Sequence, residues 1–108
     1  MMSNQSNWKG KERWWARYFG GDRNPLSGSN SKHTSGDMIH NTIYVEVKHR
    51  QRQAIISLYK DTAKKAKREG KIPVCCVSEK GMRGGLVVVH SDDLTVVANQ
   101  RVRARKGE

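Results

Sequence analysis

The chain has 108 residues, enough for one domain with a single modest core. Its 21 Lys and Arg outnumber its 10 Asp and Glu, and the net charge of +11 favours a polyanionic partner, most often nucleic acid. No run approaches the roughly 18 apolar residues of a membrane span, and the polar start lacks the apolar region of a signal peptide. We therefore expect a cytoplasmic protein with no membrane partner.

The chain opens with a predicted helix and a long loop. Four residues recur at spacings of four, three and four and so share one helical face: Trp8, Glu12, Trp15 and Phe19. Gly20 and Gly21 should end this helix. Residues 21–36 are dense in Gly, Ser, Asn and Pro, which favours turns, and they predict a long mobile loop. An acid thus lies among the aromatic residues of the helix.

Two strands should follow this loop, at residues 37–40 and 42–48, joined tightly near Asn41. Alternation in the second strand places Glu46 and Lys48 together, on the face opposite its branched apolar residues. An acid and a lysine therefore stand side by side on a strand that otherwise has the pattern of a buried one.

The second half of the chain predicts one more helix and two more strands. Residues 54–70 combine helical spacing of apolar residues with a lysine-rich outer face and a final glycine. The apolar run 72–79 should form a buried strand, parallel to the preceding one through a right-handed crossover. Cys75 and Cys76 within it are interpreted as small strand residues, since adjacent cysteines are poorly placed to pair. Residues 86–90 predict another short strand.

The fold class that follows is α/β, with a small mixed β-sheet flanked by helices. Residues 1–100 should form a single domain. Its last short helix should begin with Ser91 as the N-cap and end near Asn99. Residues 101–108 should form a flexible, solvated basic tail.

The strand acids suggest the hydrolysis of a phosphodiester bond. This reaction needs neutralised phosphate oxygens, a hydroxide near the phosphorus and a stabilised leaving oxygen, and Mg²⁺ can serve all three needs. As a hard cation it prefers oxygen ligands. Asp37 and Glu46 could supply carboxylates and Val47 a carbonyl. Lys48 would then place a positive charge beside the attacking water or the scissile phosphate.

The motif SGD at residues 35–37, followed by EVK at residues 46–48, resembles the signature of the PD-(D/E)XK nuclease superfamily, with Gly36 where proline is usual. The layout of residues 9–94 is similar to that of archaeal-type Holliday-junction resolvases. The resemblance implies a restriction-endonuclease-like core and a Mg²⁺ cofactor for which Mn²⁺ can substitute. It also implies a branched or four-way-junction DNA substrate, cut by a homodimer because symmetric cutting takes two active sites.

The same resemblance implies further site residues. Glu12 would be an additional metal ligand and contribute to catalysis. Ser27 or Ser29 in the loop would touch the junction, with Ser29 placed among the catalytic residues.

DNA contacts are expected along the loop, the basic connector and the second helix, at Arg23, Ser27, Ser29, Lys32, His33, Arg50, Arg52, Lys60 and Lys64. Dispersed cations of this kind contact phosphates without reading bases. We therefore expect binding to depend on DNA structure and salt rather than on base sequence.

Two alternatives remain open. The first is a general or nicking nuclease of phage or mobile-element type. The second is a non-catalytic nucleic-acid-binding module of the same fold, in which Glu46 and Lys48 form a surface ion pair and Glu12 is a solvated helix charge. Trp14 and Tyr18 form a second aromatic stripe that could pack, join a dimer interface or stack on bases, and we favour packing.

Overall fold

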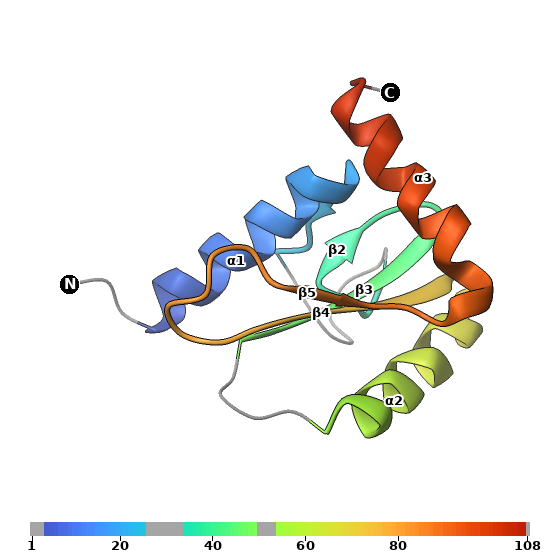
Figure 1. The fold of residues 1–108 in the computed structure, drawn as a ribbon, viewed down its shortest axis with the longest axis horizontal. Coiled ribbons are helices and arrows are strands. Elements are labelled where there is room, and N and C mark those ends of the chain that lie inside the picture. Colours follow the sequence, from blue (N-terminus) through green and yellow to red (C-terminus); the bar gives the residue numbers. More distant parts are fainter. Residues whose placement is uncertain (1–3, 26–33, 50–53, 108) are drawn as a thin grey trace.

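The computed structural model describes residues 4–25, 34–49 and 54–107, with side chains from residue 9 onward in the first segment. The elements in chain order are α1 (Asn4–Phe19), β1 (Asp22–Arg23), β2 (Met38–Ile39), β3 (Ile43–His49), α2 (Ile55–Arg68), β4 (Ile72–Ser78), β5 (Leu86–Val88), the 3₁₀ turn η1 (Ser91–Asp93) and α3 (Leu94–Arg105) (Figure 1). No helix in these segments is both long enough and apolar enough to cross a membrane.

Two small sheets organise the chain. Strands β1 and β2 form an antiparallel pair, and a second sheet has the order β3-β4-β5. Strand β4 runs parallel to β3 and antiparallel to β5, so this sheet is mixed. The predicted α/β class with a small mixed sheet is confirmed. The predicted parallel pairing of the 72–79 strand with the Glu46 strand is confirmed as well.

Helices cover both faces of the three-stranded sheet (Figure 1). On one face, α1 and α3 enclose a core made of Trp15, Ala16, Phe19, Met38, Ile43, Val45, Val47, Val74, Cys76 and Val97. On the other face lies α2, where Thr62 Oγ1 is 3.3 Å from the sulfur of Cys75. The alternation predicted for β3 therefore holds, because its branched residues enter the core and Glu46 lies on the opposite face.

The predicted helices at the start and the middle of the chain are both present. Glu12, Trp15 and Phe19 are buried together, as their spacing predicts, whereas the side chain of Trp8 lies outside the described residues. Helix α2 buries Thr62 and Ala66. Gly70 follows it with a φ of +66°, a conformation that glycine adopts readily and that commonly ends a helix.

Both strands predicted at residues 37–40 and 42–48 are present, as β2 and β3, but the predicted hairpin pairing between them is wrong. Strand β2 pairs instead with β1, which lies at the start of the segment predicted to be a loop. Gly21 permits this close approach, because a Cβ atom there would lie 2.6 Å from the carbonyl oxygen of Ile39. His40 closes the connection to β3: its Nδ1 accepts the N–H of Thr42 at 3.0 Å, so its Nε2 donates to the carbonyl of Phe19 at 3.2 Å.

The end of the chain also differs from the prediction. Helix α3 does not stop near Asn99 but continues to Arg105, through most of the residues assigned to a basic tail. Arg101 from that segment donates to the carbonyl of Tyr18 at 3.0 Å. The prediction of Ser91 as the N-cap is wrong: the His90 side chain caps the 3₁₀ turn by accepting the N–H of Asp92 at 3.1 Å, and Asp93 is the N-cap of α3.

Candidate functional site

Asp37 and Glu46 meet at the outer edge of β3, the edge strand of the mixed sheet. The N–H of Asp37 donates to the carbonyl of Val45 at 3.0 Å. The Asp37 carboxylate accepts the N–H of Val47 through Oδ2 at 2.8 Å. Asp37 therefore spans the two residues that flank Glu46, and the two carboxyl groups interact directly. The acids that were predicted to share a site are adjacent in space.

The surroundings of Asp37 disfavour its negative charge. Burial is the main cause that raises the pKa of Asp37 to about 7, and the charge of Glu46 acts in the same direction. The hydrogen bond from the Val47 N–H opposes the rise, and the charge of Glu12 adds to it. A buried carboxyl held beside other carboxyls is typical of sites whose charge is balanced by a ligand, although structural clusters also occur.

The oxygen atoms at this edge fit a hard divalent cation. In an extended strand the N–H and C=O of one residue lie on the same edge. The carbonyl of Val47 therefore lies on the edge that Asp37 occupies. Two carboxylates and one carbonyl, completed by water, form a donor set that Mg²⁺ accepts. Within segments 4–25, 34–49 and 54–107, no three acidic, histidine or cysteine side chains converge as a complete metal cage.

Glu12 approaches the same site from α1 but in an ion pair. Its side chain is buried, and its Oε1 accepts a hydrogen bond from Nε of Arg23 at 2.9 Å. The alternative of a solvated helix charge does not describe this residue. Arg23, expected among the DNA contacts, is turned toward the acid and is only partly exposed, with 23% of its side-chain surface accessible.

Lys48 lies beside Glu46, as the strand alternation predicts. Its Nζ is 3.5 Å from Oε2 of Glu46, and both side chains are partly buried. The sequence favoured substrate charge over pairing with Glu46 as the reason for this lysine, whereas the structure shows the ion pair. Under either explanation, the Lys48 ammonium lies beside the carboxyl group of Glu46, which interacts with that of Asp37.

The expected DNA contacts divide into described and undescribed residues. Lys60 and Lys64 are exposed on α2, on the Glu46 side of the sheet. The remaining expected contacts lie outside the described residues: Ser27, Ser29, Lys32, His33, Arg50 and Arg52. The catalytic role expected of Ser29 falls in the same segment.

The second aromatic stripe makes contacts within the chain at its surface, where Tyr18 is half-buried and Trp14 is exposed. The rings of Trp14 and Tyr18 stack, with centroids 5.3 Å apart and planes 20° from parallel. Lys11 lies over the Trp14 ring, and the guanidinium of Arg101 lies 4.0 Å from the Tyr18 ring centroid. Cations of this kind are attracted to aromatic faces. These contacts agree with the interpretation of the stripe as a packing surface.

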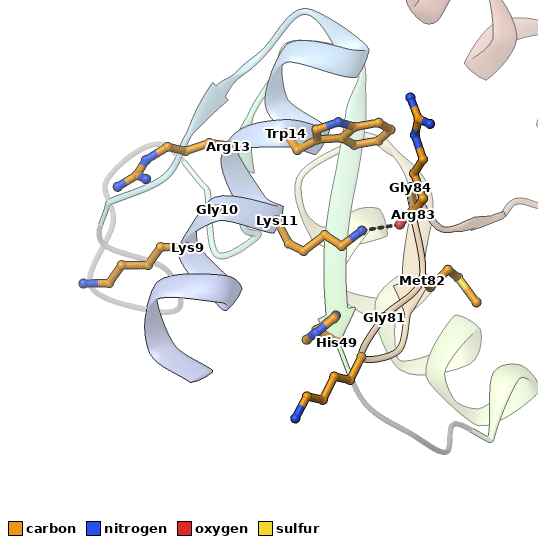
Figure 2. A pocket seen from close by; sticks show the side chains of 11 residues that line it. Lys9, Gly10, Lys11, Arg13, Trp14, His49, Gly81, Met82, Arg83 and Gly84 are labelled. Carbon is orange, nitrogen blue, oxygen red and sulfur yellow. Dashed lines mark hydrogen bonds between the residues drawn. The ribbon is translucent and has the colours of Figure 1, made fainter. Parts of the chain in front are cut away.

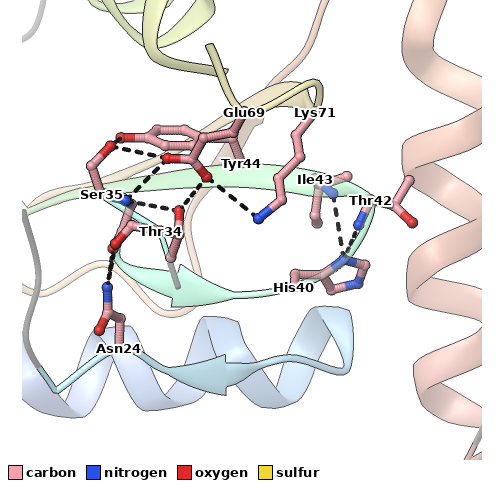
Figure 3. Close-up of polar contacts among 10 residues, drawn as sticks. Asn24, Thr34, Ser35, His40, Thr42, Ile43, Tyr44, Glu69 and Lys71 are labelled. Carbon is pink, nitrogen blue, oxygen red and sulfur yellow. Dashed lines mark hydrogen bonds and ion pairs between the residues drawn. The ribbon is translucent and has the colours of Figure 1, made fainter. Parts of the chain in front are cut away.

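A polar clamp that the sequence did not suggest fixes the segment before Asp37 (Figure 3). At the end of α2, the Glu69 carboxylate accepts hydrogen bonds from Thr34 Oγ1 at 2.7 Å and from Ser35 N–H at 3.0 Å. From the other side, the Asn24 amide donates to the carbonyls of Thr34 and Gly36 at 3.0 and 2.9 Å. These bonds set the path by which the chain reaches Asp37.

Replacing Glu69 by Gln should lower the free energy of unfolding by about 1–2 kcal/mol, because charge-assisted hydrogen bonds stabilise more than neutral ones. Burial works to raise the pKa of Glu69, but the hydrogen bonds from Thr34 and Ser35 outweigh it and the pKa lies below its usual 4.5. The stabilisation should therefore be present above about pH 4.5 and lost as the pH falls further. Urea unfolding at pH 7 and pH 3 measures this difference.

The matched control is Glu79→Gln, which makes the same chemical change at an exposed residue. It should leave stability nearly unchanged. Equal effects at the two positions would show that the clamp contributes nothing specific.

The chain has no match among known proteins. No protein-family model matches it, and neither a curated protein nor a solved structure does so.

Proposed function

We propose that the protein is a divalent-metal-dependent endonuclease with a restriction-endonuclease-like core that cuts branched DNA in the cytoplasm, with the four-way junction as its leading substrate. The observation that carries the proposal is the meeting of Asp37 and Glu46 at the edge of β3, with Lys48 beside them. In a chain of charge +11, a protein that only binds phosphates gains nothing from clustered carboxylates.

The site residues would divide the work as follows. Asp37, Glu46 and the carbonyl of Val47 would hold Mg²⁺ or Mn²⁺, and Glu12 would add negative charge from α1. When bound, such a cation neutralises phosphate charge and lowers the pKa of a coordinated water.

The protein's own cation adds a further contribution. The Lys48 ammonium, paired with Glu46 in the structure, would turn to the scissile phosphate and stabilise the charge that develops there. Buried neighbours hold the carboxylates in place before the substrate arrives, so little reorganisation is needed.

Symmetric cutting of a four-way junction takes two active sites related by a two-fold axis, so the proposal includes a homodimer. Strand β5 and helix α3 expose apolar side chains that a second copy could cover, namely Leu86, Val87, Leu94 and Val102. Such exposed apolar side chains are typical of association surfaces when they are contiguous.

A non-catalytic nucleic-acid-binding module is the second candidate. It is favoured by one observation, the intramolecular ion pairs of Glu12 with Arg23 and of Glu46 with Lys48. In such a module the paired acids would stabilise the fold, and other Lys and Arg side chains would bind DNA.

Cleavage assays separate the two candidates. A labelled four-way junction and a linear duplex of the same base composition are incubated with the protein in Mg²⁺ and in EDTA. We expect the junction to be cut in Mg²⁺, the duplex to be cut more slowly, and neither to be cut in EDTA. Equal cutting of both substrates would leave a general nuclease, and binding without any cutting would support the non-catalytic module.

A further inference from the structure

A basic cleft lies between α1 and the turn that connects β4 to β5 (Figure 2). Its volume is about 650 Å³, and it is lined by five Lys and Arg side chains and by His49. None of the described residues that line it is acidic. The cleft belongs to neither the acid cluster nor the expected DNA contacts.

The Lys11 side chain joins the two walls of the cleft. Lys11 and Trp14 extend from α1 toward the turn, whereas Lys9 and Arg13 extend to the other side of the helix (Figure 2). The ammonium of Lys11 donates to the carbonyl of Gly84 and lies 5.7 Å from the Trp14 ring centroid. Lys11 is thus part of the wall, and the exposed cations on the turn are left to meet a ligand.

The cleft and the candidate site share two elements, with His49 on the α1 face of β3 and Glu46 on the opposite face. Helix α1 carries Glu12 between two cleft residues, and β3 carries His49 directly after Lys48. His49 Nδ1 lies 2.9 Å from the hydroxyl of Ser78, at the end of the neighbouring parallel strand. The cleft therefore opens at the carboxyl ends of two parallel strands, where α/β folds commonly bind their ligands.

We propose that this cleft binds an unpaired DNA strand next to the bond that is cut, an inference that rests on the proposed nuclease function. Lys80 and Arg83, both exposed on the turn, would contact successive phosphates. A cleft of this volume is of the size that takes small ligands, so it suits a few nucleotides of one strand rather than a double helix.

The apolar part of the cleft sets the kind of contact. Trp14 and Met82 line it, but Tyr18 stacks on the Trp14 ring and Lys11 also lies over that ring. The indole therefore offers its edge to a sugar rather than a free face to a base. Recognition should be independent of base sequence. Preferred substrates should present an unpaired strand beside the cut, as flaps, splayed arms and opened junctions do.

The test measures the binding of a labelled oligo-dT strand by fluorescence anisotropy in EDTA, where no cutting occurs. The double variant Lys80→Gln/Arg83→Gln removes two cleft charges. Each single-strand phosphate contact contributes about 0.7 to the slope of log K against log salt, so the slope should fall by about 1.4. If the variant and the wild type bind equally at 1 M salt, where phosphate contacts are screened, a slope difference of about 1.4 makes the variant bind roughly 25-fold more weakly at 0.1 M salt.

The matched control is Arg105→Gln/Lys106→Gln, which removes the same charge at the end of α3. The neighbouring Ala104 packs against Gly20, at the opposite end of α1 from the cleft. This variant should keep the wild-type slope. An equal loss of affinity in both double variants would show that only net charge matters and would overturn the cleft assignment.

Four further results bear on the inference. Weakened binding of duplex and single strand by the same factor in the cleft variant would overturn the unpaired-strand assignment. If the wild type binds oligo-rU more tightly than oligo-dT, and this binding needs Lys80 and Arg83, the ligand of the cleft is RNA and the assignment to DNA is overturned. If the wild type cuts junctions and the cleft variant binds oligo-dT normally, the cleft assignment fails and the nuclease proposal stands. If the wild type cuts no DNA but its oligo-dT binding needs Lys80 and Arg83, the nuclease proposal fails while the cleft keeps its ligand.

Discussion

Replacing Asp37 by Asn should lower the rate of DNA cleavage by roughly 10²-fold or more, because it removes preorganised charge from the point where phosphate charge must be stabilised. The fold should persist, since the amide oxygen of Asn can still accept the Val47 N–H that Asp37 accepts at 2.8 Å. Most of the affinity for DNA should persist as well, because dispersed cations supply it. Single-turnover cleavage of a labelled junction in Mg²⁺ measures the loss.

Glu46→Gln and Lys48→Ala should cause losses of similar size, since both residues contribute to the same cluster. The control is Asp61→Asn, which makes the same chemical change at an exposed position on α2 and should cut at the wild-type rate. Ordinary cleavage by the Asp37 or the Glu46 variant would remove the assignment of the site.

Parts of this fold that depend on regular spacing could be predicted from the sequence. Glu12 and Trp15 share a buried helical face because residues three and four apart lie on one side of a helix. Glu46 and Lys48 share a strand face because the side-chain period of a strand is two. The Asp37–Glu46 pair was expected because the two acids lie on consecutive predicted strands, and the structure places the two carboxyl groups together.

Features that depend on contacts between distant residues could not be predicted in this way. The pairing of β1 with β2 was missed, because β1 has only two residues and is too short to show alternation. The Glu69 clamp joins residues 35 positions apart. Helix α3 continues through Arg101 and Arg103 because arginine is a good helix former, and the density of charge alone suggested a solvated tail.

One pairing changes how the predicted site residues are understood. Glu12 was expected to bind metal and Arg23 to bind DNA, as two separate roles. The structure joins them at 2.9 Å, so the arginine balances a buried acid near Asp37. A loss of activity in either single variant would therefore report on both residues. A double variant is needed to separate their contributions.

Asp37→Asn should also make the metal-free protein more stable at pH 8, by about 1–3 kcal/mol, since a pKa that differs by one between the folded and unfolded states corresponds to about 1.4 kcal/mol. The pKa of Asp37 is raised from 3.8 to about 7. The unfolded chain therefore loses this proton at a lower pH than the folded protein does. Folding stability falls as the pH rises from about 4 to about 7 and stays reduced above that range. The variant recovers part of this loss because Asn never ionises.

Urea unfolding in EDTA at pH 8, 6 and 3 tests this expectation. The difference between Asp37→Asn and the wild type should be largest at pH 8 and disappear at pH 3, where the aspartate is protonated in both states, while the exposed control Asp61→Asn should show no trend. Adding Mg²⁺ at pH 8 should stabilise the wild type, because a ligand that binds only the folded state raises its stability, and should stabilise the variant much less. A variant that is less stable than the wild type at pH 8 in EDTA, together with a wild type that gains no stability from Mg²⁺, would show that the Asp37 carboxylate serves the fold rather than a cation.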